Sequence, residues 1–517
     1  MRRLEIVSVD DAVARIPTGS TVAIQGSGGG VGEPTAVIAA IERRFLADGT
    51  PRDLTLVHAT GLGDRDTIGT DLLAHPGLVR KDIAGHLGMA PKMARLIHEN
   101  VVEGYNLPQG VISHLYTAIA GRKPGVFTKV GLGTFVDPRI EGGRVNEIAQ
   151  DTMVEVIELR GTEWLFFPAF AINVAIIRGT VADTRGNIAT YQEAAILEAI
   201  SIAQAARACG GIVIAQVKYL TEAGSLPAQD VRIPGVFVDY VVVDPSQKQH
   251  TLTEYDPSLS GQVRIPLERL KAGELDVRTV IARRAARELQ PGMVVNLGVG
   301  IPSHVAEVAT ETGVIDQITF TVEQGLIGGR PAGGVIFGVA HNPEAIISED
   351  DQFTFYDGGG LDIAFLGMAE LSGNGDVNVS KVGPMLSGCG GFINITQNAP
   401  RVVFCGTFTA QGLRCSVGGG RLRIDQEGRT NKCVATLGQI TFSGEQARHN
   451  GQEVLYVTER AVFRLGENGP VLIEIAPGVD LQRDVLDLMD FVPEIADPLA
   501  TMDAACFLKK PAEAATR

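Results

Sequence analysis

The feature of this sequence that most constrains its fold is a regular alternation of apolar, strand-like runs with amphipathic helical stretches. STVAIQG (20–26) has the pattern of a buried strand, a glycine-rich turn follows it, and EPTAVIAAIERRFLADG (33–49) has the pattern of a helix. Pro34 lies near the first turn of that helix and Gly49 just past its end, the positions that these residues prefer. DLTLVHA (53–59) is the next strand. Strands separated by helices predict parallel, doubly wound sheets.

The same alternation continues along the chain. AAILEAISIAQAARACGG (194–211) predicts a buried helix that ends at glycine. In the second half, VRTVIARRAARELQPG (277–292) predicts a helix, MVVNLG (293–298) a strand, SHVAEVATETG (303–313) a helix and QITFTVE (317–323) a strand. The halves also end alike, because GIVIAQV leads to IPGV and VLYVTER leads to APGV. This similarity suggests a duplicated α/β unit, although chance also explains so few matches.

The length of the chain indicates more than one domain, because 517 residues exceed one ordinary hydrophobic core. The segment 246–276 is polar, contains prolines and has no helical stripe, so we interpret it as a linker. The prediction is an α/β fold of two similar domains, 1–245 and 277–517, each with a largely parallel sheet flanked by helices.

The composition of the chain argues against some classes of binding partner. The net charge of −15 argues against nucleic acid and against anionic membrane surfaces. No two of the six cysteines have CxxC spacing, which favours reduced thiols in a cytoplasm. The N-terminus turns acidic where a signal peptide would have its apolar core. The apolar stretch 164–177 is too short to span a bilayer, so we expect it in the core.

Several familiar motifs are missing from the sequence. GxxxxGK[ST], HExxH and GxSxG do not occur, which removes the obvious NTPase, zinc protease and hydrolase interpretations. GSGGGVG has its third glycine at the wrong place for a dinucleotide loop. The nine histidines form no cluster with metal-ligand spacing, so no metal site is predicted. We interpret His58, His86 and His114 as structural or surface residues.

One carboxylate, Glu323, occupies a position typical of a functional site. Along QITFTVE it ends the predicted strand and lies on the face opposite Phe320 and Val322. Sites in open parallel sheets form beyond the carboxyl ends of strands. The glycine-rich sequence QGLIGGRPAGG follows and would let a bulky ligand approach the backbone. The alternative is a strand-end carboxylate that caps a turn or pairs with Arg330.

Three further turns carry weaker signals. YNLPQG (105–110) places Gln109, a neutral side-chain donor, after a proline. YDGGGLDIAFLG (356–367) has three glycines before a buried strand, and SGCGGFINITQN (387–398) has Gly388, Gly390 and Gly391 before another. Each of these turns alone is consistent with an ordinary loop.

Taken together, these segments resemble the class I CoA-transferases, and in particular the fused type in which the α- and β-subunits form one polypeptide, as in bacterial acetate and propionate CoA-transferases. The resemblance extends almost from end to end. The segments that carry it are GLGDR, EGYNLPQG, KPGVFTKVGLGTFVDPR, PGVFVDYVVVDP, VNLGVGIP, TVEQGLIGG, FYDGGGLD, VNVSK, GCGGFINITQN, FCGTFTA, ITFSG and EIAPGVDLQRDVLD. The family's fold is two similar α/β domains, in line with the suspected duplication.

The resemblance also assigns roles to residues. The glutamate of the TxExG segment is the family's nucleophile, here Glu323. The glutamine of the PQG turn, here Gln109, and a backbone amide of the GCGG loop, Gly390 or Gly391, would bind the oxyanion. The residues expected to line the CoA site are Asn296, Gly298, Gly328, Gly329 and Gly388. Gln324 is larger than the residue at this place in some relatives, which bears on substrate size.

The reaction implied by the resemblance moves CoA from a short-chain acyl-CoA to a free carboxylate such as acetate, acetoacetate or propionate. It would proceed by a ping-pong mechanism through a glutamyl-CoA thioester on Glu323. CoA and acyl-CoA are then substrates, and no permanently bound cofactor is expected. The family also suggests a homodimer or homotetramer.

Two other functions remain open from the sequence. An acyl-CoA hydrolase on the same fold would resolve the glutamyl-CoA with water, but it would need no second acid pocket. A non-enzymatic sensor of acyl-CoA or carboxylate would have no need of Glu323 with Gln109, and no output module is visible in the sequence.

Overall fold

The structure, a computed structural model, describes residues 4–267 and 275–509 and divides into two compact units. Unit 1 comprises the residues up to Ile265, Thr321–Gly358 and Gly383–Asn394, and unit 2 comprises Pro266–Phe320, Gly359–Val382 and the residues from Ile395 onward. Two segments from the second half of the sequence thus belong to unit 1. Residues 246–265 of the predicted linker also belong to unit 1, and 268–274 lie outside the described residues. The division of the sequence into halves 1–245 and 277–517 stays a prediction.

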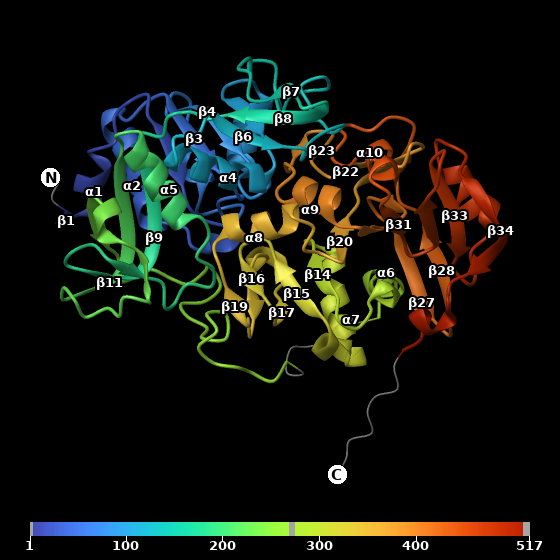
Figure 1. The fold of residues 1–517 in the computed structure, drawn as a ribbon. Coiled ribbons are helices and arrows are strands. Elements are labelled where there is room, and N and C mark those ends of the chain that lie inside the picture. The colour runs from blue at the N-terminus through green and yellow to red at the C-terminus, as the bar shows by residue number, and fades with distance from the viewer. Residues whose placement is uncertain (1–3, 268–274, 510–517) are drawn as a thin grey trace, which may run out of the picture. The chain divides into compact units, whose positions relative to one another are not determined.

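Unit 1 is built on a large sheet whose principal strands are all parallel (Figure 1). Their spatial order is β1 (Glu5–Val7), β13 (Tyr240–Val243), β11 (Ile212–Thr221), β9 (Val174–Asp183), β2 (Thr21–Ile24), β3 (Leu54–His58), β4 (Val79–Ala84) and β5 (Glu103–Asn106). Two short strands, β10 (Ile188–Ala189) and β12 (Val231–Ile233), extend it through antiparallel pairing. The predicted α/β class with parallel sheets is confirmed.

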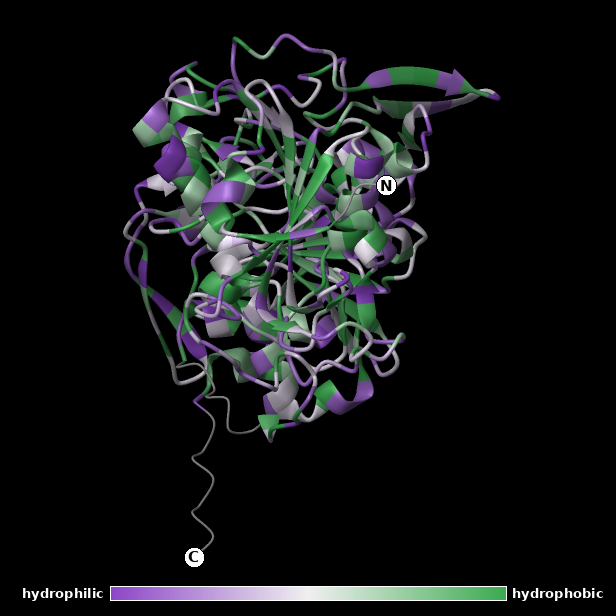
Figure 2. Ribbon diagram, turned by 90° about the vertical axis from the view of Figure 1, so that its left-hand side faces the viewer, coloured by the Kyte–Doolittle hydropathy of each residue, from purple (hydrophilic) through white to green (hydrophobic). Residues whose placement is uncertain are grey.

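The strands of the unit 1 sheet are apolar because helices cover the faces of the sheet. Every residue of β3 is buried, and β9 is buried at all but one position, as expected for strands covered on both faces. Figure 2 shows the central strands largely in the hydrophobic colour, while hydrophilic residues gather on helices and loops. The helices are α1 (Val9–Val13), α2 (Thr35–Asp48), α3 (Pro91–His98), α4 (Gln109–Ala120), α5 (Ala199–Ala208) and α8 (Glu349–Asp357).

For two of these helices, α2 and α5, the observed ends can be compared with those predicted from the sequence. Helix α2 has Pro34 at its N-cap and Gly49, with φ of 67°, at its C-cap, as predicted. Helix α5 begins at Ala199 and not at residue 194. The reason is that Leu197 has a positive φ of 50°, a left-handed conformation that a helix cannot contain. This break sets the position of Glu198, the N-cap residue of α5.

A small antiparallel sheet also belongs to unit 1, in the order β6 (Gly125–Thr128), β8 (Thr162–Pro168) and β7 (Glu155–Leu159). The apolar stretch 164–177 forms the end of β8 and the start of β9, so it is extended rather than helical. Of the helices in the described ranges, none is long and apolar enough to cross a membrane.

The strands of the second large sheet that lie wholly in unit 2 run in the order β14 (Val294–Leu297), β20 (Ile363–Gly367), β25 (Arg401–Cys405), β31 (Glu453–Val457), β32 (Ala461–Leu465), β33 (Pro470–Ile475) and β34 (Glu494–Thr501). The first four strands are parallel. The helices of unit 2 are α6 (Val277–Ala285), α7 (His304–Thr312), α10 (Gly444–His449) and α11 (Leu481–Asp484). Helix α6 is shorter than the predicted 277–292, because a 3₁₀ turn follows at Ala286–Glu288.

Candidate active site

Glu323 directly follows β15 (Thr319–Val322), which is shorter than the predicted strand 317–323 that Glu323 was expected to end. The chain then reverses into β16 (Leu326–Ile327), which pairs antiparallel with β15. Gly325 makes this reversal possible: its φ is +98°, and a Cβ atom there would lie 2.1 Å from the carbonyl oxygen of Ile347. The turn leaves the Glu323 side chain only 9% exposed. Glu323 is thus a sheltered carboxylate held by a turn that requires glycine.

Gln109 is the first residue of α4, which begins directly after β5 and Pro108. Its backbone N–H donates to the carbonyl oxygen of Gly390 at 2.9 Å. Its side chain is 2% exposed, and Nε2 donates to Oε1 of Glu349 at 3.0 Å. Gln109 therefore joins α4 to two segments of unit 1 that follow it in the sequence by more than 200 residues.

Glu349 is a site residue that the sequence analysis missed. It is the first residue of α8 and is fully buried. Burial holds the pKa of Glu349 well above its usual value, the negative charge of Glu198 raises it further, and the charge of Glu323 adds to the same effect. Glu349 thus hydrogen-bonds Gln109, and the charge of Glu323 acts on the same carboxyl group. The capping sequence Ser348-Glu349-Asp350-Asp351 predicts the start of a helix, but nothing in it signals that one carboxylate points inward.

The GCGG loop lies against the carboxyl ends of β4 and β5. The N–H of Cys389 donates to Oδ1 of Asn106 at 2.9 Å, and the N–H of Gly390 donates to the carbonyl oxygen of Gly85 at 2.7 Å. Gly388 has a φ of +79°, and a Cβ atom there would lie 2.8 Å from Nδ2 of Asn106. Because the Gly390 amide already has a partner, Gly391 is the better candidate for the second oxyanion donor.

The other predicted CoA-site residues fall into two groups. Gly328 and Gly329 lie in unit 1 with φ of +76° and +74°. A Cβ atom added at Gly328 would lie 2.6 Å from Cγ of Glu344, and one added at Gly329 would lie 2.2 Å from the carbonyl oxygen of His341. The close packing of the loop itself therefore requires these glycines. Asn296 and Gly298 lie in unit 2, within and just after β14. The N–H of Gly298 donates to the carbonyl oxygen of Phe365 at 2.7 Å.

His58, His86 and His114, which we interpreted above as structural or surface residues, have the following contacts. Burial tends to lower the pKa of His58, but Asp82, whose Oδ1 lies 3.0 Å from Nε2, raises it overall. Burial lowers the pKa of His86 to about 4, so that imidazole is neutral at physiological pH. His114 Nε2 lies 3.2 Å from Oγ1 of Thr354 and links α4 to α8. In the described part of the chain, no group of three or more His, Cys, Asp or Glu side chains could hold a metal ion.

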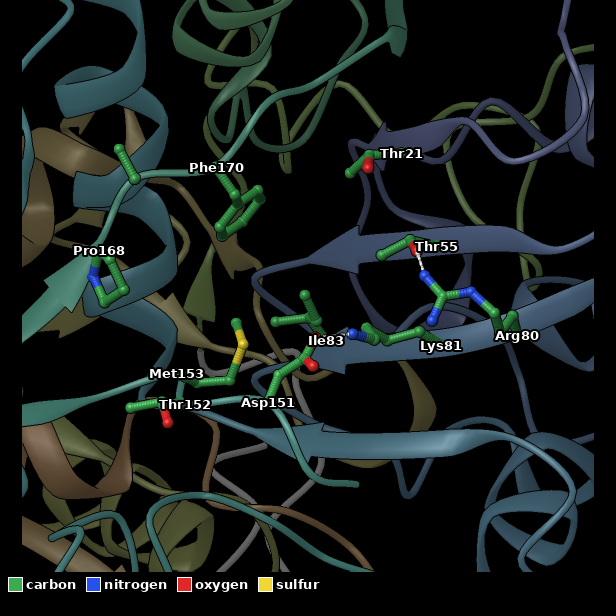
Figure 3. A pocket seen from close by; sticks show the side chains of 11 residues that line it. Thr21, Thr55, Arg80, Lys81, Ile83, Asp151, Thr152, Met153, Pro168 and Phe170 are labelled. Atoms are coloured by element: carbon green, nitrogen blue, oxygen red, sulfur yellow. Dashed lines mark hydrogen bonds and ion pairs between the residues drawn. The ribbon is translucent and has the colours of Figure 1, made fainter. Parts of the chain in front are cut away.

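A cavity of about 410 Å³ lies at the opposite edge of the unit 1 sheet, by the amino ends of β2, β3 and β4 (Figure 3). Its cations are already paired: Arg80 and Lys81 contact Glu103 at 2.9 and 3.2 Å, and Lys81 also contacts Asp151. The rest of the lining includes Ile83, Met153, Pro168 and Phe170. The cavity therefore lies away from the carboxyl-end site around Gln109.

Comparisons with known proteins identify the family of the chain. The family described as Coenzyme A transferase matches residues 6–244 and 278–406. Caffeate CoA-transferase of Acetobacterium woodii is 46% identical over 514 residues, 98% of each chain. Acetate CoA-transferase YdiF of Escherichia coli K12 is 42% identical over 507 residues, 98% of this chain and 96% of its own.

A crystal structure of the acyl-CoA transferase YdiF from E. coli O157:H7, a thioester complex with CoA, matches with a TM-score of 0.94 and 41% identity. The match covers 98% of this chain and 96% of that one. With a family match over most of its length and full-length relatives above 40% identity, the chain belongs to the coenzyme A transferase family.

Proposed function

We propose that this enzyme moves CoA from a short-chain acyl-CoA to a free carboxylate by a ping-pong mechanism, with Glu323 as the nucleophile. The observation that carries the proposal is the sheltered carboxylate of Glu323 at the carboxyl end of a strand, whose charge acts on Glu349, the buried group that binds the neutral donor Gln109. The solved structure of YdiF as a thioester complex with CoA supports the same route.

The proposed steps explain why a carboxylate is used. Glu323 attacks the acyl carbonyl, the thiolate of CoA leaves, and a mixed anhydride forms. The CoA thiolate then attacks the glutamyl carbonyl of that anhydride, which releases the first carboxylate and leaves a glutamyl-CoA thioester. A second carboxylate enters and the steps run in reverse. Because one thioester replaces another, the overall change in free energy is small.

Each addition passes through a tetrahedral oxyanion that needs hydrogen-bond donors. A carboxamide nitrogen has two N–H groups. Glu349 accepts one from Nε2 of Gln109, and the other is proposed to bind the oxyanion together with the Gly391 amide. One such donor typically contributes on the order of 10²–10³ to the rate. Gly390 is the weaker candidate, because its N–H donates to Gly85.

CoA is a substrate in this scheme, and no permanently bound cofactor is invoked. The proposed CoA-lining residues are Asn296, Gly298, Gly328, Gly329 and Gly388. Binding of the distant nucleotide end of CoA would supply the energy that stabilises the reactive anhydride step. Low exposure of Glu323 suits this chemistry, because a mixed anhydride hydrolyses in contact with water.

For the acid, we propose the acetate, acetoacetate and propionate class. An acetate CoA-transferase and a caffeate CoA-transferase are both similar to this chain, and these acids differ greatly in size. Gln324 follows the nucleophile, is buried, and lies against Gly338, so it is placed to affect the space beside Glu323. A homodimer or homotetramer in the cytoplasm completes the proposal.

The test is to incubate the protein with acetyl-CoA without an acceptor acid, and to locate covalent CoA by intact mass and peptide mapping. Wild type should carry CoA on the peptide that contains Glu323, and acetate or neutral hydroxylamine should discharge it. Glu323→Ala should carry none and lose at least about 10⁴ of the transfer rate. Glu147→Gln, which changes an exposed glutamate, is the matched control and should behave as wild type.

Other outcomes separate the alternatives. Steady release of free CoA from acetyl-CoA, with no transfer of CoA to added propionate, would favour an acyl-CoA hydrolase. A CoA adduct that persists in Glu323→Ala would assign the nucleophile to another carboxylate.

A further inference from the structure

Glu349 makes two side-chain hydrogen bonds through a single oxygen atom. Its Oε1 accepts from Nε2 of Gln109 at 3.0 Å and from Oγ of Ser113 at 3.1 Å. Gln109 and Ser113 are four residues apart on α4, so they lie on the same face of that helix. All three side chains are 2% exposed or less. Glu349 is therefore a buried acceptor aimed at the donor that the proposed reaction uses.

The backbone fixes this carboxyl group from the other side. The N–H of Glu349 donates to the carbonyl oxygen of Leu197 at 3.2 Å. Leu197 is the residue with a positive φ directly before α5, so the break in that helix provides the acceptor. Helices α4, α5 and α8 thus all contribute to the position of Glu349.

A second buried carboxyl group, Glu198, accompanies Glu349. Burial raises the pKa of Glu198 to about 8, and the charge of Glu198 in turn raises the pKa of Glu349. Neither oxygen of Glu198, nor Oε2 of Glu349, makes a hydrogen bond to another residue in the described part of the chain. Asp350, His58, Tyr116 and Glu323 are the other titratable groups that interact with this pair.

These features favour an uncharged Glu349. An ionised carboxylate in such a site loses its hydration, the hydrogen bonds from Gln109 and Ser113 only partly offset that loss, and protonation removes the cost. A neutral carboxylic acid still accepts hydrogen bonds at its carbonyl oxygen, as Oε1 does here. The neutral group also adds no negative charge beside the oxyanion of the reaction.

We propose that Glu349 is a positioning residue for CoA transfer: its Oε1 holds one Nε2 hydrogen of Gln109, so that the second hydrogen is directed to the oxyanion. Without this acceptor, the terminal torsion of Gln109 is free to rotate, and the donor is lost for much of the time. The inference rests on the proposed function, and it predicts an effect on kcat with little effect on the KM for acyl-CoA.

The test compares two replacements of similar volume, only one of which keeps an oxygen acceptor for Gln109 and Ser113. Glu349→Met keeps most of the volume but has no oxygen to accept the hydrogen bonds. Glu349→Gln keeps a carbonyl oxygen for Gln109 and Ser113, and it replaces Oε2, which has no hydrogen-bond partner among the described residues, with an amide N–H₂. We expect Glu349→Met to lower kcat about 10- to 100-fold with KM within twofold, and Glu349→Gln to stay within about threefold of wild type.

A double-mutant cycle with Gln109→Ala then connects the two residues. If Glu349 acts through Gln109, the double variant Gln109→Ala/Glu349→Met should be no slower than Gln109→Ala alone. Ser113→Ala, which removes the other donor to Oε1, should change kcat less than threefold. Melting temperatures establish that each variant is folded, and Glu349→Ala replaces Glu349→Met if the latter is not.

Several results would overturn the inference. These are a kcat of Glu349→Met equal to that of wild type, multiplicative losses in the double variant, or Glu349→Gln as slow as Glu349→Met. The proposed function is judged separately, because wild type must first form the CoA adduct on Glu323. An active wild type with an equally active Glu349→Met rejects the positioning role alone, whereas an inactive wild type rejects the proposed function.

Discussion

Buried carboxyl groups are the most informative single residues of this protein. Glu33, Glu198, Glu323 and Glu349 all lie in unit 1 and are 9% exposed or less. Burial raises the pKa of Glu33 to about 7 and of Glu198 to about 8, because an ionised carboxylate loses its hydration. Glu349 and Glu198 lie with the proposed site, whereas Glu33 ends the first glycine-rich turn and accepts the N–H of Gly63 at 3.0 Å.

The pKa of Glu33 gives a prediction for stability. An acid whose pKa rises from 4.5 to about 7 on folding contributes stability below about pH 4.5, and this is lost as the pH rises through 7. The Glu33→Gln variant has an uncharged amide at this position, so its stability does not decrease with pH for this reason. The melting temperature of Glu33→Gln relative to wild type should therefore increase between pH 5 and pH 8, by the equivalent of up to about 3 kcal/mol.

Measuring the difference between the two proteins removes the contributions of all other groups. A difference in melting temperature that is constant from pH 5 to pH 8 would contradict the assignment. The side-chain amide oxygen introduced by Glu33→Gln can still accept the N–H of Gly63, so the turn itself is expected to persist.

At the scale of secondary structure, the site consists of the starts of helices and the ends of strands. Gln109 begins α4, Glu349 begins α8, Glu198 caps α5, and Glu323 follows β15. A residue at the first position of a helix has a fixed backbone but can project its side chain beyond the helix. The turn after β15 has the least freedom of these elements, because Gly325 has both a positive φ and no space for a side chain.

We therefore predict that Gly325→Ala lowers stability by about 1–3 kcal/mol and slows formation of the CoA adduct at least tenfold. The physical cause is that the added Cβ meets the carbonyl oxygen of Ile347, so the turn that holds Glu323 must shift. Gly313→Ala is the matched control: Gly313 has a φ of +72°, but an added Cβ there has no neighbour within 4 Å. Equal adduct rates in the two variants would refute the role assigned to the turn.

At the scale of the whole molecule, unit 1 is discontinuous in sequence. Its segments Thr321–Gly358 and Gly383–Asn394 carry Glu323, Glu349 and the GCGG loop. Helix α8 covers the face of α4 that contains Gln109 and Ser113. The first half of the chain therefore does not contain the segments that bury this face of α4.

A split of the chain tests this organisation. A fragment of residues 1–267 produced alone should be poorly soluble or lack a cooperative melting transition, since the donors on α4 lose their buried acceptor. Co-expression with residues 275–517 should give a soluble pair that purifies together and acquires CoA from acetyl-CoA. A fragment 1–267 that melts cooperatively at the temperature of the full chain would show that the later segments are not needed.

The secondary structure of the site region was largely predictable, since local patterns control it. Pro34 and Gly49 fixed the ends of α2, and the alternation in QITFTVE predicted Glu323 as the last residue of a strand, one residue beyond the end of β15. The start of α5 was predicted wrongly. The left-handed conformation of Leu197 depends on its tertiary surroundings, and no glycine at that position indicates it in the sequence. The sequence suggested Gly328 and Gly329 as residues of the CoA site, which stays a prediction, and the structure adds that the packing of the loop also leaves no space for a side chain at either position.

The sequence by itself determined the α/β class, the family resemblance and the position of Glu323, because these depend on local periodicity and on motifs of a few residues. Only the tertiary structure decided that Gln109 meets Glu349, 240 residues away, and that the amide of Gly390 is taken by Gly85. The physical reason is that a buried hydrogen bond forms between whichever groups packing brings within about 3 Å. An inward-facing glutamate at the start of a helix has the same local sequence as one that faces solvent.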